Sequence, residues 1–366
     1  MNENNNICPH QWFYYADSNG DDLQMVIREI KDPLFIPIGY VGSKFGFTTG
    51  SLIFRRFLAL LNVRNIPVQD GYNETVSSDE NFQQGIASSP IPIQFLGDTL
   101  WGGDVLLPSP ENAVPLSKYP SHILLRKAIF RALRTGKKFS IRLSGPATDL
   151  ARDLEANKDL DISNAIHEIR ISGGAINVPG NLFTVPTNTV AEFNVYLDPQ
   201  AFVNVLSAAT HHNIHVNMIP LDATDYCPID RSYFNSSLQE STFITTEGKS
   251  IGLFFENVKA AFGDAVFFND ANIPGGGFYQ WDAYTSRLDE TYDWKKSFYN
   301  VETTPLIATS GKIYQTSPEK GYPIRVGFKY DCSLFRKRWK PIFDKPYFGD
   351  GNHIASIECE KISFQC

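Results

Sequence analysis

Three aspartates near the start of the chain could bind a hard cation. In "YADSNGDDLQMVIREI", Asp17 is followed by Asp21 and Asp22. Carboxylates this close repel one another, by roughly 1 to 4 kcal/mol per pair at ~4 Å. A tight turn could bring Asp17 and Asp22 to one point, where their oxygens would suit Ca²⁺ or Mg²⁺. Capping of the following helix is an equally good interpretation, because an N-terminal Asp satisfies free N–H groups and the helix dipole.

Two further segments could add ligands to such a site. Asp282 follows Trp281 in "FYQWDAYTSRL", where helix capping is the ordinary interpretation. Ser144 begins the turn of "SGPATDLA" at the end of a strand-like run. Its carbonyl could bind a metal ion, although a purely structural turn explains the segment as well.

Amide and carboxylate groups gather in the segment from 172 to 202. Asn181, Glu192 and Asn194 lie there among residues otherwise suited to burial. Such groups can bind sugar hydroxyls when they lie near strand ends. Taken alone, hydrogen bonding within the loop is the better explanation for these three side chains.

The elements that must position these residues alternate between strand-like and helical patterns. We expect helices at 23–30 and 50–61, and strands at 12–16, 34–40, 65–71, 137–143, 167–171 and 213–219. Strand, small-residue turn and helix recurring in this order predict an α/β fold with a mostly parallel sheet covered on both faces. Polar residues follow the strands directly, where open α/β sheets place their sites.

The 366 residues suit one domain with long loops. We expect loops at 71–118, 225–250 and 286–320, a solvent-edged strand at 322–331, and a domain boundary at 336. Residues 337–366 then form a C-terminal tail.

The net charge of −7, with both signs interspersed, argues against a nucleic acid or a membrane as the principal partner. The first residues, "MNENNNICPHQ", lack the apolar segment of a signal peptide, which favours the cytoplasm. A secreted protein whose signal peptide has been removed would look the same. The five cysteines show no CxxC pair and no zinc spacing, which predicts mostly free thiols.

Seven segments, in order, resemble the nucleoside hydrolases, the inosine–uridine-preferring family of N-ribohydrolases. That family opens with D-x-D-P-G-x-D-D, and "YADSNGDD" fits this frame with Asp17, Asp21 and Asp22 on its last three aspartates. "SGPATDLA" resembles T-G-P-L-T-N-[IV]-A. The other segments are "SGGAINVPGN", "AEFNVYLDPQAF", "IPLDATDYCPI", "FYQWDAYTSRL" and "YPIRVGFKYDCSLF". The resemblance covers residues 12 to about 336 and implies one doubly wound α/β domain.

The resemblance also implies a Ca²⁺ site beside a ribose site. The implied metal ligands are the Ser144 carbonyl and the carboxylates of Asp17, Asp22 and Asp282. The implied contacts to ribose hydroxyls come from Asp21, Asn181, Glu192 and Asn194. Asp17 and Asp282 are the implied catalytic residues, and Asp17 acts as the general base toward a water that Ca²⁺ orients.

The implied reaction is hydrolysis of the N-glycosidic bond of ribonucleosides to base and ribose, as in nucleoside salvage. Trp281 stands where many members carry His, and in the purine-preferring branch a tryptophan there stacks on the base. Trp101 is either a second stacking partner or a loop anchor. Members are typically dimers or tetramers, so a homo-oligomer is implied.

Several positions depart from the family pattern. Tyr15 replaces its first aspartate, Ser18-Asn19 replaces Pro-Gly, and Phe47 replaces an asparagine. These departures leave two alternatives open. One is a nucleoside-binding protein with weakened catalysis on the same scaffold, and the other is a hydrolase of another ribosyl compound.

Overall fold

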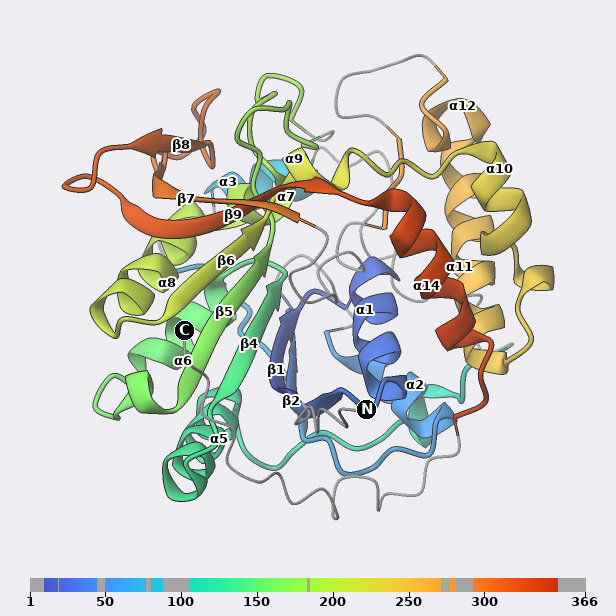
Figure 1. The fold of residues 1–366 in the computed structure, drawn as a ribbon, viewed down its shortest axis with the longest axis horizontal. Helices are drawn as coiled ribbons and strands as arrows, with labels where there is room; N and C mark the ends of the chain where they lie inside the picture. Colours follow the sequence, from blue (N-terminus) through green and yellow to red (C-terminus); the bar gives the residue numbers. More distant parts are fainter. Residues whose placement is uncertain are drawn as a thin grey trace, which may run out of the picture.

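The computed structural model describes residues 10–18, 20–44, 50–76, 80–87, 106–182, 185–270, 277–280 and 292–347. The described strands form one nine-stranded sheet in the order β3-β2-β1-β4-β5-β6-β9-β7-β8 (Figure 1). Their bounds are β1 His10–Ala16, β2 Phe35–Gly42, β3 Val68–Asp70, β4 Phe139–Ser144, β5 Ile166–Ser172, β6 His215–Ile219, β7 Tyr292–Val301, β8 Ile313–Thr316 and β9 Tyr322–Tyr330.

Helices cover both faces of this sheet (Figure 1). The longer helices are α1 Gly20–Lys31, α2 Leu52–Leu60, α3 Glu80–Ala87, α5 Ser121–Thr135, α6 Thr148–Glu155, α8 Pro199–His211, α11 Thr246–Phe262 and α14 Cys332–Phe343. The shorter ones are α7 Phe193–Leu197, α9 Leu221–Thr224, α10 Arg231–Tyr233 and α12 Asp264–Phe267.

Strand β1 shows why both faces are covered. Trp12 and Tyr14 belong to a core cluster that includes residues of α1, α2, α11 and α14. Phe13 and Tyr15 point to the opposite face and join a second cluster with residues of α5, α6 and α8. All four side chains are buried. A strand with apolar or aromatic residues on both faces belongs at the centre of such a sheet.

The direction in which the chain is wound changes between β1 and β4. Strand β1 pairs in parallel with β2 on one side and with β4 on the other. From β1 the chain continues outward to β2 and β3, and it then returns to build β4, β5 and β6 on the other side. Ala16 and Ser144 are paired at the carboxyl ends of β1 and β4. Open α/β sheets bind ligands at such a switch point.

The predicted mostly parallel α/β sheet is confirmed, but all three expected loops contain regular structure, and α3 lies within residues 71–118. Residues 286–320 include β7 and β8, which pair antiparallel to each other, and β7 also pairs antiparallel to β9. Many residues of β7 are exposed or only partly buried. The amino-acid composition of this segment therefore resembles that of a loop. Residues 225–250 include α10, the short helices η3 Phe234–Leu238 and η4 Glu240–Thr242, and the start of α11.

The expected boundary at 336 falls inside α14, so the domain continues beyond it. Phe335, Trp339 and Phe343 recur every four residues on α14 and are at most 1% exposed. They join the same core cluster as Trp12. This apolar stripe packs α14 onto the domain, whereas residues 348–366 lie outside the described part of the chain.

The expectation of mostly free thiols is wrong for one pair. Cys227 and Cys332 form a disulfide with a Cα–Cα distance of 5.4 Å. They are 105 residues apart, and the folding of β9 brings them together, so spacing in the sequence gave no sign of the bond. No helix within the described ranges has the length and apolar character to span a bilayer.

Candidate active site

The turn between β1 and α1 places two of the predicted ligands. Asp17 directly follows β1, and Asp22 lies in the first turn of α1. Between them Ser18 has a left-handed backbone with φ of 62°, and its Oγ lies 2.8 Å from the hydroxyl of Tyr40 on β2. From the β4 side, a Cβ atom on Gly145 would lie 2.8 Å from the Asp17 nitrogen, so only glycine allows this approach.

Ser144 connects the end of β4 to two other predicted site residues. Its hydroxyl donates a hydrogen bond to the Asp22 carboxylate, and both side chains are at most 1% exposed. Its carbonyl accepts a hydrogen bond of 3.4 Å from Nδ2 of Asn194. The Ser144 carbonyl, predicted as a metal ligand, therefore faces the segment predicted to bind ribose.

Glu192 and Asn194 lie at the start of α7. The Glu192 carboxylate caps this helix, because it accepts hydrogen bonds from the Asn194 amide at 3.0 Å and the Val195 amide at 3.2 Å. It also accepts one from the amide of Gly174, after β5, at 3.2 Å. Asn181 supports the same turn, since its Oδ1 accepts from the Phe193 amide at 2.9 Å. The loop hydrogen bonding expected here is thus present, and it fixes these side chains at the carboxyl ends of the strands.

One polar atom among these side chains is available to bind a ligand. The Oδ1 atom of Asn194 is buried and accepts no hydrogen bond from the described part of the chain. Burying an acceptor without a partner costs about 1 to 3 kcal/mol. Nδ2 of the same side chain is held by Ser144, so Oδ1 is fixed as an acceptor for a hydroxyl.

The site is strongly acidic. Burial raises the pKa of Glu192, and the negative charge of Asp17 raises it further. Asp17 and Glu192 therefore interact, although one follows β1 and the other caps α7. A bound cation would stabilise both charges.

The oxygen donors at the site fit a hard cation such as Ca²⁺. Asp17, Asp22 and the Ser144 carbonyl supply them, and neither His nor Cys is in this set. The described ranges by themselves contain no group of three or more acidic, His or Cys side chains arranged to hold a metal ion. Asp282, the remaining expected ligand, lies outside those ranges, as do Trp281 and Trp101. Asp21 shares the first turn of α1 with Asp22.

A second acidic group, which was not identified from the sequence, lies on α6. The Asp153 carboxylate accepts hydrogen bonds from Tyr15 at 2.8 Å, Ser121 at 2.9 Å and Tyr72 at 3.0 Å. Burial raises the pKa of Asp153 to about 6. It raises that of Asp149, one turn earlier, to about 7. Tyr15, which replaces the first aspartate of the family motif, therefore ties β1 to α6.

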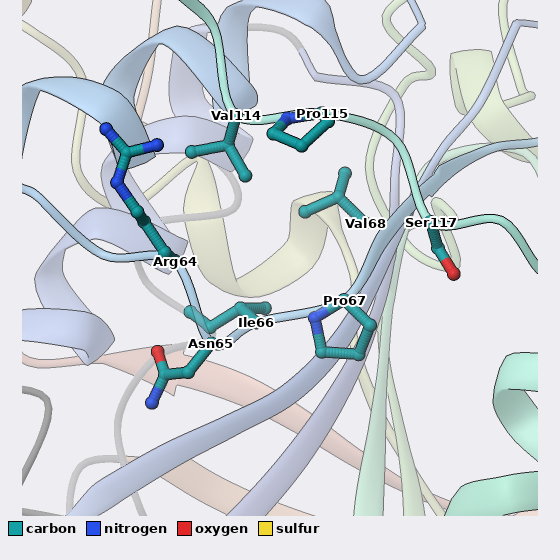
Figure 2. Close-up of a pocket in the computed structure, with 8 residues that line it drawn as sticks. All are labelled: Arg64, Asn65, Ile66, Pro67, Val68, Val114, Pro115 and Ser117. Atoms are coloured by element: carbon teal, nitrogen blue, oxygen red, sulfur yellow. The ribbon is translucent and has the colours of Figure 1, made fainter.

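A pocket of about 510 Å³ lies elsewhere, at the start of β3 (Figure 2). It is lined by Arg64, Asn65, Ile66, Pro67, Val68, Val114, Pro115 and Ser117. The first five of these residues precede or begin β3, at the opposite end of the sheet from Ser144, and the other three lie on the segment before α5. The pocket is therefore separate from the acidic site.

The family model described as "Inosine-uridine preferring nucleoside hydrolase" matches residues 35–335. Nucleoside hydrolase 3 of Arabidopsis thaliana is 35% identical over 117 residues, which are 29% of this chain and 12% of that protein. Nucleoside hydrolase 4 of the same plant is 30% identical over 169 residues, which are 40% of this chain and 30% of that protein. The matches thus span less than a third of either relative's length.

Solved structures share the fold. The plant nucleoside hydrolase PpNRh1 superposes with a TM-score of 0.70 at 16% identity, covering 92% of this chain and 100% of that one. The purine-preferring ribonucleoside hydrolase from Gardnerella vaginalis gives 0.70 at 18% identity, covering 91% and 99%. At these identities the likeness shows a common architecture.

Proposed function

The chain belongs to the inosine-uridine preferring nucleoside hydrolase family, and on this basis we propose that it is a Ca²⁺-dependent ribonucleoside hydrolase. The reaction cleaves the N-glycosidic bond and releases the base and ribose. The observation that carries the proposal is the convergence of Asp17, Asp22, Ser144, Glu192 and Asn194 at the switch point of the sheet.

Asp17, Asp22, Asp282 and the Ser144 carbonyl would hold the metal ion. Once bound, Ca²⁺ would supply positive charge that orients a water molecule and the ribose hydroxyls and lowers the pKa of that water. The protein itself fixes two of these ligands. The Ser144 hydroxyl holds the Asp22 carboxylate, and the turn at Ser18 holds Asp17.

Asp17 is the general base in this mechanism. It accepts a proton from the attacking water, while the C1′–N bond breaks through an oxocarbenium-like ribosyl cation. The buried carboxylates of Asp17 and Glu192 stabilise this cation in a site from which bulk water is largely excluded. Oδ1 of Asn194 accepts a hydrogen bond from a ribose hydroxyl. Displacement by a single water predicts inversion at C1′.

We propose that the enzyme prefers purine nucleosides as substrates. Trp281 stacks on the base, and stacking favours an electron-poor, protonated purine, which aids departure without a side-chain acid. Trp101 is a second candidate for such a contact. Two of the solved structures that share the fold are those of a purine-preferring ribonucleoside hydrolase and an inosine-guanosine nucleoside hydrolase. We also expect a homo-oligomer, which light scattering would test.

A substrate panel tests this proposal. Base release from inosine, guanosine, adenosine, uridine and cytidine is followed by chromatography with Ca²⁺ present. Faster release from purine nucleosides is the expected result. Faster release from uridine would overturn the purine preference but would leave the assignment as a nucleoside hydrolase intact. No release from any of the five, by folded protein, would favour a binding protein or another ribosyl substrate.

A further inference from the structure

Three buried polar side chains form a directed chain of hydrogen bonds that ends at α1. The Tyr233 hydroxyl donates to Oε1 of Gln280 at 2.9 Å. Nε2 of Gln280 donates to Oε1 of Gln24 at 2.8 Å, across 256 residues of sequence. Nε2 of Gln24 donates to the Gly20 carbonyl at 3.1 Å. The chain therefore links α10, the segment 277–280 and the first turn of α1, which carries Asp21 and Asp22.

Both glutamine side chains are completely buried, at 0% exposure. In each of them the carbonyl oxygen accepts one of these hydrogen bonds and the amide nitrogen donates one. Breaking a link leaves a buried polar atom without its partner, which destabilises that arrangement. The network is therefore specific for glutamine at both positions, since neither a carboxylate nor an apolar side chain can both accept and donate here.

The far end of the network is firmly held. The Arg336 guanidinium lies 4.3 Å from the centre of the Tyr233 ring, and Arg336 also donates to Asp230 at 2.9 Å. The disulfide between Cys227 and Cys332 joins the same loop to the start of α14. Tyr233 is thus a rigid anchor from which Gln280 is positioned.

The main chain beside Gln280 is tied to the same helical layer. The Phe278 carbonyl accepts from the Ile229 amide at 3.1 Å, and the Phe278 amide donates to the Phe267 carbonyl at 3.1 Å. The side chain of Gln280 extends from this layer to α1. The bond to Gln24 therefore couples the first turn of α1 to this layer.

We propose that Gln280 and Gln24 are positioning residues that hold the first turn of α1, and with it the carboxylate of Asp22, in place at the site. The inference rests on the proposed function, because that function gives Asp22 the role of a metal ligand. Groups that orient a metal ligand without touching the metal typically change metal affinity or activity 10- to 100-fold when removed. Neither glutamine contacts the reacting atoms in this account.

Gln280→Leu tests the proposal, because it keeps the side-chain volume and removes both hydrogen bonds. Gln200→Leu is the matched control, since Gln200 is a glutamine of α8 whose side chain donates to a neighbour on the same helix, Asn204, at 2.9 Å. Ca²⁺ binding to the metal-free proteins is measured by calorimetry, and kcat and KM for inosine are measured across a Ca²⁺ titration.

We expect Gln280→Leu to weaken Ca²⁺ binding by about 10- to 100-fold and to move the midpoint of the Ca²⁺ titration of kcat by the same factor. Gln200→Leu should match the wild type. A merely structural role would lower the melting temperature without moving this midpoint.

Failure of the proposed function and failure of this inference give different results. A wild type that neither binds Ca²⁺ nor releases base overturns the proposed function and this inference with it. An active wild type beside a folded Gln280→Leu with unchanged Ca²⁺ affinity overturns the inference and leaves the function. If Gln280→Leu does not fold, Gln24→Met removes the same glutamine–glutamine bond within a helix and is judged by the same criteria.

Discussion

The Ser144 hydroxyl donates a hydrogen bond to the carboxylate of Asp22, 122 residues earlier in the chain. This bond joins the end of β4 to the first turn of α1, across the point where the winding of the sheet changes direction. The same serine accepts from Asn194 through its carbonyl. One residue therefore aligns the proposed metal side of the site with the proposed ribose side.

Replacing Asp17 should abolish most of the activity. Asp17→Asn keeps the shape of the side chain but removes the base that accepts a proton from water, so kcat for inosine should fall by about 10²- to 10⁴-fold. Circular dichroism should show an unchanged fold, and nucleoside binding should partly survive. Asp159→Asn, at an exposed aspartate on the surface, is the control. If Asp17→Asn kept more than a tenth of the activity, Asp17 would not be the general base.

The buried ion pair between Glu29 and Arg142 should be important for stability. Arg142 Nη2 lies 2.7 Å from Glu29 Oε1, and the two side chains are 1% and 0% exposed, respectively. Glu29→Gln removes the carboxylate that is paired with this buried guanidinium, which should lower the free energy of unfolding by about 3 to 5 kcal/mol in urea denaturation. The exposed pair of Glu155 and Lys158 provides the control, where Glu155→Gln should change the free energy of unfolding little. Equal effects of the two variants would contradict this account.

Asp149 should make stability depend on pH. Its carboxylate accepts from the Tyr72 amide at 2.6 Å, and burial, reinforced by Asp153, raises its pKa to about 7. The unfolded chain has a pKa of about 3.9 at this position. Between about pH 4 and pH 7 the folded state therefore binds more protons than the unfolded state, so this contribution to stability is complete at low pH and is lost as pH rises.

Asp149→Asn removes this loss, since an amide has no charge to bury. "SGPATDLA" carries Asp149 where the family motif has Asn, so the replacement restores the family residue. We expect the free energy of unfolding to rise by on the order of 2 kcal/mol at pH 8 and to change little at pH 4. Urea denaturation at both values measures this, with Asp159→Asn as the control. A gain of the same size at pH 4 would show that titration of Asp149 is not the cause.

The disulfide should be found in the native protein. Peptide mapping without reduction should recover Cys227 linked to Cys332. Breaking a cross-link that closes a long loop should lower the free energy of unfolding by roughly 2 to 4 kcal/mol, which Cys332→Ser or mild reduction would show. Alkylation of both thiols in folded, unreduced protein would contradict the pairing.

Local patterns made much of the fold predictable. Strand-like runs followed by small-residue turns located β1, β2 and β4 to β6, and Asp17 and Asp22 were recognised together because they are neighbours in the chain. Contacts between distant segments were not predictable. The Ser144–Asp22 bond depends on the order of strands in the sheet, and the Gln24–Gln280 bond joins residues 256 positions apart. The hairpin of β7 and β8 was missed because many of its side chains face solvent.

Base release from inosine, measured with and without Ca²⁺, tests the central claim most directly. Wild-type protein is treated with a chelator, assayed, and assayed again after Ca²⁺ is added in excess. We predict that chelation lowers the rate to about a hundredth or less and that Ca²⁺ restores it. An unchanged rate in the chelator would contradict a metal-dependent site at Asp17, Asp22 and Ser144, and no hypoxanthine release in either condition would contradict the hydrolysis of nucleosides.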